Sequence, residues 1–517
     1  MAFSLATHET AMRAVTNPGS LSPERLVVAA MMTAIAALIL AVAGVAVGVP
    51  LAVSMLVSFG LGASSCSWIA RRLPREWDGL RRTHRGWCLL WLLLALAAVA
   101  RTAGVAWFMA DPTHAQASVY WFDGFYRSHS CYSQYWRAAE LARAGARNLY
   151  DTAHYAGKIG RFGVDEFLYV PQFLILPRLG LAVGGDFYQI RAAWFALEAA
   201  LLAVATLALC KWIGGPAGRR LALLLPALWL SSPILATLQV GNYQLAAIAL
   251  AIIAMLSFER NRPLLGGALL ALAAFKLWPG ILLVYLVVTK RWRPVAWTIA
   301  FSLLYCAIAY LWMGSRPYEA FLHYDWPRIV SRDAWPYVED DLDVSGINDS
   351  VPGLVLKLKA LGVHGMTHSL EDIVEKAWTL VVLGLAVLAA LGERHLSRQE
   401  RACCWLSLLT LASFRAPFIP DIYGLITPLL LWSLVAASTQ FTGRTTAWLA
   451  MLWAALSAVL PFTGTPLVGY GRLAVSTASQ FIAIGLCFWV LFRYLRRSPE
   501  THTAPLINSN QFVYGGK

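Results

Sequence analysis

One stretch of the sequence, Gln239–Arg293, constrains the fold more than any other. Its second apolar run, Leu264–Val288, is about 25 residues long and lies between two basic clusters, Glu259-Arg260-Asn261-Arg262 and Lys290-Arg291-Trp292-Arg293. Basic clusters beside short membrane loops stay on the cytoplasmic side, so both ends of this run should lie on the same face of the membrane. Two full crossings need roughly 20 residues each. We therefore expect two half-length helices that enter the membrane and return, as a re-entrant hairpin.

The tip of this hairpin carries a positive charge. The sequence at the middle of the run is Phe275-Lys276-Leu277-Trp278-Pro279-Gly280. Backbone groups freed by a proline at membrane depth are tolerated only where protein or a wet cavity satisfies them, and a lysine inside the membrane is by default a functional candidate. We expect the amine of Lys276 to point into a cavity that opens to the outer face and to bind an anionic group there.

Composition indicates a polytopic membrane protein with aromatic belts. The chain has 517 residues, of which 58% are hydrophobic, 14% are charged and 22 are tryptophans, and its mean hydropathy is +0.58. The formal net charge of +14 gathers in short loops between apolar runs, which is typical of a topology signal rather than of nucleic-acid binding. Of the eight cysteines, only Cys131 lies in a polar extramembrane stretch, so a disulfide framework is not expected.

We predict an all-α bundle of about twelve full crossings in addition to the hairpin. Residues 1–25 and 498–517 are polar tails, assigned to the cytoplasm. Residues 26–86 form an extra N-terminal transmembrane hairpin and a basic cytoplasmic loop, and 87–497 form the transmembrane catalytic domain. The crossings are expected within 26–70 (two) and near 87–109, 188–212, 221–238, 243–258, 294–312, 375–392, 402–416, 423–438, 446–462 and 475–492.

Two long polar segments, 111–187 and 313–374, should form outer loops. Acidic residues dominate the second segment, which is the reverse of the inner loops. The first contains an expected interfacial helix with Gly145 as its stop, because apolar residues follow a helical stripe at Tyr132, Tyr135, Trp136, Ala139 and Ala142.

Polar groups on the outer side are the candidates for a functional site. Asp123 lies among aromatic residues, which suits a general base that takes a proton from a hydroxyl, or it is a turn aspartate before Gly124. Gln239 and Asn242 lie at a helix break, where their amides could hold sugar hydroxyls or cap the helix that begins at Tyr243.

A second outer connection contains Arg415 and Asp421, which could form a structural pair, or Arg415 could reach a phosphate. We add His129, Tyr135 and Asp421 to the residues expected to contact substrate. Two other charged residues, Arg101 and Glu198, are expected to form a structural ion pair inside the bundle. We predict no metal site, because the acidic run Glu339–Asp343 is more typical of a solvated loop, and no cofactor.

Several short motifs, taken in order, resemble glycosyltransferase family 87. They are Tyr135-Trp136-Arg137-Ala138-Ala139, Asn148-Leu149-Tyr150-Asp151, Phe167-Leu168-Tyr169-Val170-Pro171, Gln239-Val240-Gly241-Asn242, Gly266-Gly267 and Lys276-Leu277-Trp278-Pro279 with Arg291-Trp292-Arg293. The resemblance covers about residues 87–440. It implies a multi-pass enzyme of the C superfamily of glycosyltransferases in the inner membrane of a bacterium, with its active site facing the periplasm or exterior.

The resemblance also implies a reaction. A sugar, typically mannose, would pass with inversion from a polyprenyl-phosphate donor to a lipid or glycan acceptor, without a nucleotide. Lys276 and Arg415 would stabilise the leaving phosphate, and Asp123 would activate the acceptor hydroxyl.

One position departs from the family pattern. Where the family usually has an aspartate, this chain has Cys131. Either Asp123 has taken the role of base, or the chain is an inactive relative. A polytopic transporter or lipid flippase is the alternative, and it would predict two halves related by an internal repeat, which is not visible here.

Overall fold

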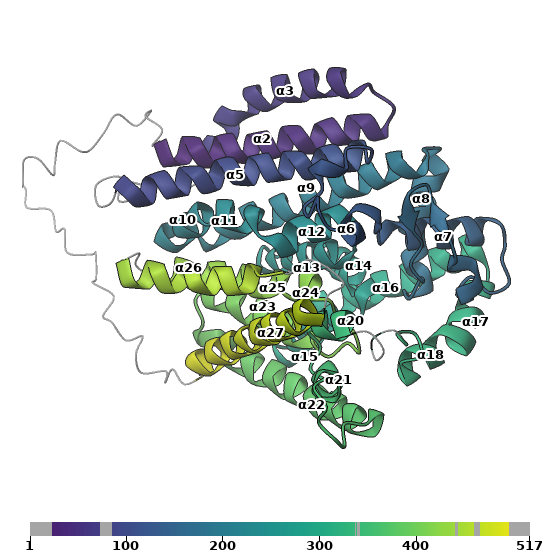
Figure 1. Cartoon of the computed structure of the whole chain (residues 1–517). Helices are drawn as coiled ribbons and strands as arrows, with labels where there is room; N and C mark the ends of the chain where they lie inside the picture. The colour runs from purple at the N-terminus through teal and green to yellow at the C-terminus, as the bar shows by residue number, and fades with distance from the viewer. Residues whose placement is uncertain are drawn as a thin grey trace, which may run out of the picture.

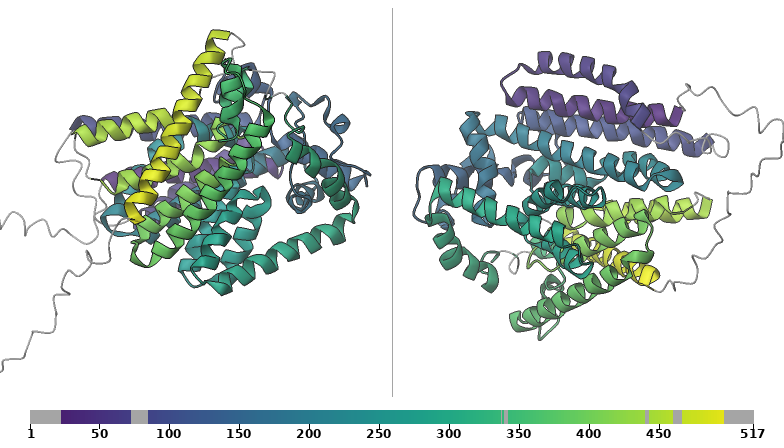
Figure 2. Two further views of the ribbon diagram at one scale, coloured as in Figure 1. Left: turned by 90° about the horizontal axis from the view of Figure 1, so that it is seen from below. Right: turned by 180° about the vertical axis from the view of Figure 1, so that it is seen from behind.

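The computed structural model describes residues 23–72, 85–336, 338, 342–439, 443–459 and 466–495 (Figures 1 and 2). Most of the predicted tails, most of the basic loop near 71–85 and the acidic residues 339–341 lie outside the described residues. Within them the chain is helical, apart from a small antiparallel hairpin of β1 (Lys158–Ile159) and β2 (Phe162–Gly163). The predicted all-α class is confirmed.

Six of the described helices are long and apolar enough to cross a membrane. They are α2 (Pro23–Ala46), α5 (Arg85–Ala110), α9 (Phe187–Ile213), α16 (Trp292–Met313), α22 (His368–Gly392) and α27 (Pro466–Leu495). Large apolar side chains stand exposed on their outer surfaces, for example Leu96, Leu311 and Leu380. Exposed apolar surface on this scale is typical of contact with lipid, so the chain is a multi-pass membrane protein.

A seventh span results if one bent stretch is counted as a single crossing. It comprises α10 (Gly215–Leu223), α11 (Leu225–Leu230) and α12 (Ser232–Val240), with a bend of 57° before α12. Pro226 and Pro233 stand in the first turns of α11 and α12. A proline is tolerated in a first turn but interrupts a helix that continues through it, so the sequence divides one predicted crossing into three pieces.

The other predicted crossings correspond to shorter or less apolar helices. These are α3 (Leu51–Arg72), α13 (Gln244–Glu259), α23 (Arg398–Ser413), α25 (Ile426–Ala437) and α26 (Gly443–Ser457). The number of twelve crossings therefore stays a prediction, whereas the positions of the helices agree with the predicted runs. In the N-terminal part, α2 and α3 form an antiparallel pair, and α2 packs against α5 and α9 (Figure 1).

The stretch between the basic clusters folds as two short helical arms. The first arm is α14 (Pro263–Ala273) with η4 (Ala274–Lys276), and the second is η5 (Trp278–Gly280) with α15 (Ile281–Val288). The longer arm, Pro263–Lys276, spans roughly 21 Å at 1.5 Å per residue, which is short of the ~30 Å hydrocarbon core. Leu277 joins the two arms with φ of 63°, a conformation that is unusual for a residue with a side chain.

Ion pairs hold the two ends of this hairpin together. Arg291 lies 2.7 Å from Glu259 and also pairs with Glu393 of η7 (Glu393–His395), and Arg401 pairs with Glu259. Both basic ends therefore lie at the same end of the bundle, as predicted, and Lys276 lies at the opposite end of the hairpin.

The two predicted outer segments lie together at one end of the bundle (Figure 1). The first contains η1 (Ala115–Ala117), α6 (Gly124–Ser128), α7 (Tyr132–Arg143), η2 (Thr152–Tyr155), η3 (Pro171–Leu174) and α8 (Ile175–Val183). The second contains α17 (Arg316–Ala320), the π-helix η6 (Phe321–Asp325), α18 (Trp326–Ser331), α20 (Leu342–Ile347) and α21 (Gly353–Ala360). Its Asn348 forms an isolated β-bridge with Pro420, directly before α24 (Asp421–Gly424). Arg328 joins the segments through a 2.9 Å ion pair with Glu166.

The predicted interfacial helix exists as α7, but its apolar stripe does not lie along a membrane surface. Tyr132 and Tyr135 are fully buried, and their rings contact Trp194 of α9. Gly145 follows the helix with φ of 72° and ends it as predicted. The stripe faces protein because α9 and η3 supply an aromatic surface that matches it, and sequence periodicity does not distinguish such a surface from lipid.

The ion pair expected between Arg101 and Glu198 is wrong. Arg101 donates to the carbonyl oxygen of Val119 at 2.6 Å, whereas Glu198 is fully buried in α9, close enough to Lys276 for an electrostatic interaction. The two residues were expected to lie at similar depths in the membrane, but depth alone does not determine which faces of two helices contact each other.

Close packing of α14 on α16 generates a prediction about stability. A Cβ atom at Gly267 would lie 2.6 Å from Cβ and 2.7 Å from the carbonyl carbon of Trp297, while one at Gly280 would meet no atom within 4 Å. We expect Gly267→Ala to lower the free energy of unfolding by about 1–3 kcal/mol, because the backbones must separate. Thermal unfolding in detergent measures this, with Gly280→Ala as the control, since Gly280 has a helical φ of −56°. Equal unfolding midpoints for the two variants would contradict the packing argument.

Candidate functional site

A cavity of about 1320 Å³ lies between the two outer segments and the bundle. Its wall comes from the start of α7, the chain after β2, the tip of the hairpin, α22 and residues 412–423. Charged side chains of both signs line it, together with apolar residues of α15 and α22. A volume above the usual range of about 300–1,000 Å³ for small-molecule sites suits a ligand with both a polar part and a long apolar part.

Lys276 lies on this wall, above an aromatic ring. Its Nζ is 4.8 Å from the centroid of the Tyr169 ring, and the Tyr169 hydroxyl is 2.7 Å from that of Tyr135. Within the described residues no carboxylate forms an ion pair with Lys276, although Cys131 and Glu198 are close enough to interact electrostatically. A cation over a ring face is attracted to it but keeps its hydrogen-bonding capacity. The amine is therefore available to a bound anion.

Tyr135, predicted to contact substrate, does not line the cavity. Its hydroxyl accepts a hydrogen bond from the backbone N–H of Tyr243 at 3.1 Å and contacts the hydroxyl of Tyr169. Tyr135 therefore acts on the site through Tyr169, whose ring it holds in position.

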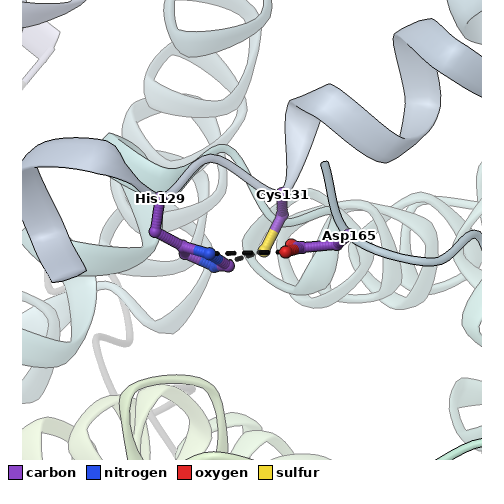
Figure 3. Close-up of side chains that lie close together, drawn as sticks. All are labelled: His129, Cys131 and Asp165. Atoms are coloured by element: carbon purple, nitrogen blue, oxygen red, sulfur yellow. Dashed lines mark hydrogen bonds and ion pairs between the residues drawn. The ribbon is translucent and has the colours of Figure 1, made fainter. Parts of the chain in front are cut away.

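A second group of polar side chains lies on the same wall, around Cys131 (Figure 3). The Sγ atom of Cys131 is 3.5 Å from Nε2 of His129 and 3.0 Å from the hydroxyl of Tyr423. Nδ1 of His129 lies 3.5 Å from Oδ1 of Asp165. His129 and Cys131 directly precede α7, and Asp165 follows β2, so the short β-hairpin returns the chain to this point.

The charges of this group influence one another. Burial alone would lower the pKa of His129, but Asp165 and Cys131 outweigh it and raise the pKa to about 9. Burial raises the pKa of Asp165, and His129 and Cys131 partly offset that effect. The imidazole and the carboxylate thus stabilise each other in their charged forms.

The two amides at the helix break have different positions. Asn242 lines the cavity, where its Nδ2 lies 3.5 Å from Sγ of Cys131, and its Oδ1 accepts from the N–H of Gln244 at 3.0 Å. It therefore caps α13 and faces the cavity as well. Gln239 does not line the cavity, because its side chain accepts from the Val119 N–H and donates to Ser118 and Tyr126.

Asp123 is buried and does not line the cavity. Its carboxylate accepts a hydrogen bond from the N–H of Phe125 at 2.8 Å and caps α6. Asp123 therefore has the position of a turn aspartate, which the sequence analysis considered as the alternative to a general base.

Arg415 and Asp421 both line the cavity but do not pair with each other. Arg415 lies 2.9 Å from Glu375 and donates to Thr379 at 2.6 Å. Asp421 is buried and accepts from the N–H of Ile422 at 2.7 Å. Arg415 therefore pairs with Glu375, and not with Asp421 as considered from the sequence.

Two carboxylates of the cavity wall, Asp165 and Glu166, were absent from the sequence-based candidates. They stand in a polar stretch without a recognisable spacing to His129 or Cys131, so no local signal marked them. The only sequence feature close to them that had been singled out is the aromatic motif Phe167–Pro171, which directly follows Glu166.

Comparison with known proteins relates part of the chain to a family. No curated protein and no solved structure matches the chain. The model of Glycosyltransferase family 87 matches residues 167–419, which include Tyr169, Lys276 and Arg415 but not His129 or Cys131. Residues 167–419, which contain the hairpin tip and most of the cavity wall, are therefore similar to Glycosyltransferase family 87.

Proposed function

We propose that this protein transfers a sugar from a polyprenyl-phosphate donor to a lipid or glycan acceptor inside the cavity. Similarity of residues 167–419 to a glycosyltransferase family and the multi-pass architecture support the reaction class. The observation that carries the proposal is the amine of Lys276 on the cavity wall, with no ion-pair partner among the described residues. We further propose mannose as the sugar, twelve crossings with a re-entrant hairpin, and a bacterial inner membrane with the cavity open to the outer side.

The donor would bind with its phosphate at Lys276. An ammonium group in a site of low dielectric constant stabilises a phosphate more strongly than it does in water, and most strongly as charge develops on the leaving oxygen. Apolar residues of α15 and α22 on the same wall, such as Ile281, Val284 and Val382, offer a surface for the polyprenyl chain. Arg415 would supply a second positive charge if a phosphate displaced Glu375 from it.

The transfer requires one bond to form and one to break. The acceptor oxygen attacks the anomeric carbon, the bond from that carbon to the phosphate oxygen breaks, and its electron pair leaves with the lipid phosphate. The group formed by His129, Cys131 and Asp165 takes up the proton of the acceptor hydroxyl. We assign the base to this group rather than to Asp123, because it lies on the cavity wall and includes the position of the family's usual aspartate.

Replacement of the hairpin lysine tests the donor site. We expect Lys276→Met to lower the rate of sugar transfer by about 10²- to 10³-fold, because the charge that stabilises the leaving phosphate is lost. The measurement uses purified protein, radiolabelled polyprenyl-phosphate mannose and candidate lipid and glycan acceptors. Lys290→Met is the matched control, since Lys290 is exposed at the other end of the same hairpin. Full activity in Lys276→Met would remove this lysine from the site.

The ring below Lys276 gives a second test. Tyr169→Phe keeps the aromatic face, whereas Tyr169→Leu removes it. Because a cation–π contact contributes about 0.5–2 kcal/mol, we expect kcat/KM for the donor to be about 2- to 30-fold lower in Tyr169→Leu than in Tyr169→Phe. Equal values would show that the ring does not hold the amine.

The position of the base is tested with two amide substitutions. We expect Asp165→Asn to lower transfer by about 10²- to 10⁴-fold, the usual contribution of general base catalysis, and to lower it more than Asp123→Asn does. Initial rates at saturating donor measure both effects. A greater loss in Asp123→Asn would return the role of base to Asp123.

A further inference from the structure

We propose that His129, Cys131 and Asp165 form a binding site for a divalent transition-metal ion of the zinc class. The three residues offer one nitrogen, one sulfur and one oxygen ligand, and these ligand atoms all lie within 4.8 Å of one another. Zinc in proteins takes imidazole nitrogen, thiolate sulfur and carboxylate oxygen as ligands. The binding itself is independent of the proposed function. Only its role in the reaction rests on that proposal.

Two of the separations between ligand atoms match those of a tetrahedral site. With bond lengths of about 2.0–2.3 Å, neighbouring ligand atoms in such a site lie roughly 3.3–3.8 Å apart. The separation between Sγ of Cys131 and Nε2 of His129 is 3.5 Å, and that between Nδ1 of His129 and Oδ1 of Asp165 is also 3.5 Å. Only one ring nitrogen can bind a given ion, so these two separations do not belong to one set of three ligands. The ligand atoms, which lie within 4.8 Å of one another, must come closer by rotation of the His129 ring or of the Asp165 carboxylate.

Two polar groups contact the sulfur atom of Cys131. The hydroxyl of Tyr423 lies 3.0 Å from Sγ of Cys131 and Nδ2 of Asn242 lies 3.5 Å from it. Hydrogen bonds to a ligand atom from neighbouring groups fix its orientation and tune the metal. The other cysteines described as buried, Cys210, Cys403, Cys404 and Cys487, lie within α9, α23 and α27. Among the described residues, only the group at Cys131 combines three ligands of this kind.

The location of the group indicates what such an ion would do. All three residues line the cavity, so an ion bound by them would leave a coordination position for a water molecule or an acceptor hydroxyl. Three protein ligands with an open position are typical of catalytic zinc sites, while structural sites have four protein ligands. A hydroxyl bound to zinc loses its proton more readily. The thiolate selects zinc or cobalt over magnesium and calcium, which prefer oxygen ligands.

Metal content and a cobalt spectrum test the proposal. The full-length protein, purified in detergent without a polyhistidine tag, is incubated with one equivalent of Zn²⁺ or Co²⁺ and passed through a desalting column. We expect about one ion to remain per chain by mass spectrometry of the metal. The cobalt form should show d–d bands and a sulfur-to-cobalt charge-transfer band. An absence of both bound metal and the sulfur band in the wild-type protein would overturn the proposal.

Variants assign the ligands. Cys131→Ser should lose the charge-transfer band, and His129→Ala and Asp165→Asn should lose most of the bound metal. Cys306→Ser is the matched control, because Cys306 lies half-buried in α16 and outside this group. Unfolding midpoints establish that the variants remain folded, and the wild-type spectrum decides the question for any variant that does not. Retention of metal and band by Cys131→Ser equal to the wild type would exclude the site.

The outcome also separates this proposal from the proposed function. If the protein binds cobalt through Cys131 but transfers no sugar, the metal site is supported and the proposed glycosyltransferase function is contradicted. If the protein transfers sugar at an unchanged rate after a chelator has removed all metal, the glycosyltransferase function stands and the ion has no role in the reaction, while the metal content and the cobalt spectrum still decide whether the site binds metal.

Discussion

A positive charge held among apolar helices is the constraint on which the rest of this structure depends. Moving an ammonium group out of water costs several kcal/mol unless nearby groups compensate it. Lys276 obtains part of that compensation from the face of the Tyr169 ring. This contact does not replace a direct ion pair. The proposed function accounts for this arrangement, because a lipid phosphate is an anion that reaches this depth together with its own apolar tail and would supply the missing partner.

Two rigid features keep that charge in place. At one end of the bundle, Arg291 and Arg401 bind Glu259 and Glu393, which pins both arms of the hairpin. At the other end, the rings of Tyr135, Phe173 and Trp194 pack around Tyr169 or its neighbours. Aromatic pairs in tilted and edge-on geometry add to the stability that burial provides. Ion pairs at the basic ends of the hairpin and aromatic packing beside its tip thus fix the position of the tip.

The sequence was sufficient for the hairpin and for most helix positions, because both depend on local signals. Basic clusters, the length of an apolar run and Pro279 determine a half-length hairpin without knowledge of its neighbours. The candidate site depended on long-range geometry. Gln239 and Asn242 are three residues apart, yet only Asn242 reaches the cavity, because Gly241 turns the chain with φ of 71°. Asp165 reaches Cys131 only through the β1–β2 hairpin, which leaves no periodic signal in the sequence.

The surroundings of Cys131 give a physical meaning to a cysteine at the position where the resemblance leads us to expect an aspartate. Buried polar groups destabilise a fold unless they have partners, and an apolar residue here would leave His129, Asn242 and Tyr423 without the sulfur they now contact. An inactive relative could lower that cost by replacing the whole group with apolar side chains. This chain instead keeps an imidazole, a carboxylate and an amide around the sulfur, on the wall of the cavity that also contains Lys276. Such an arrangement favours a change in the chemistry of proton removal over the loss of that chemistry.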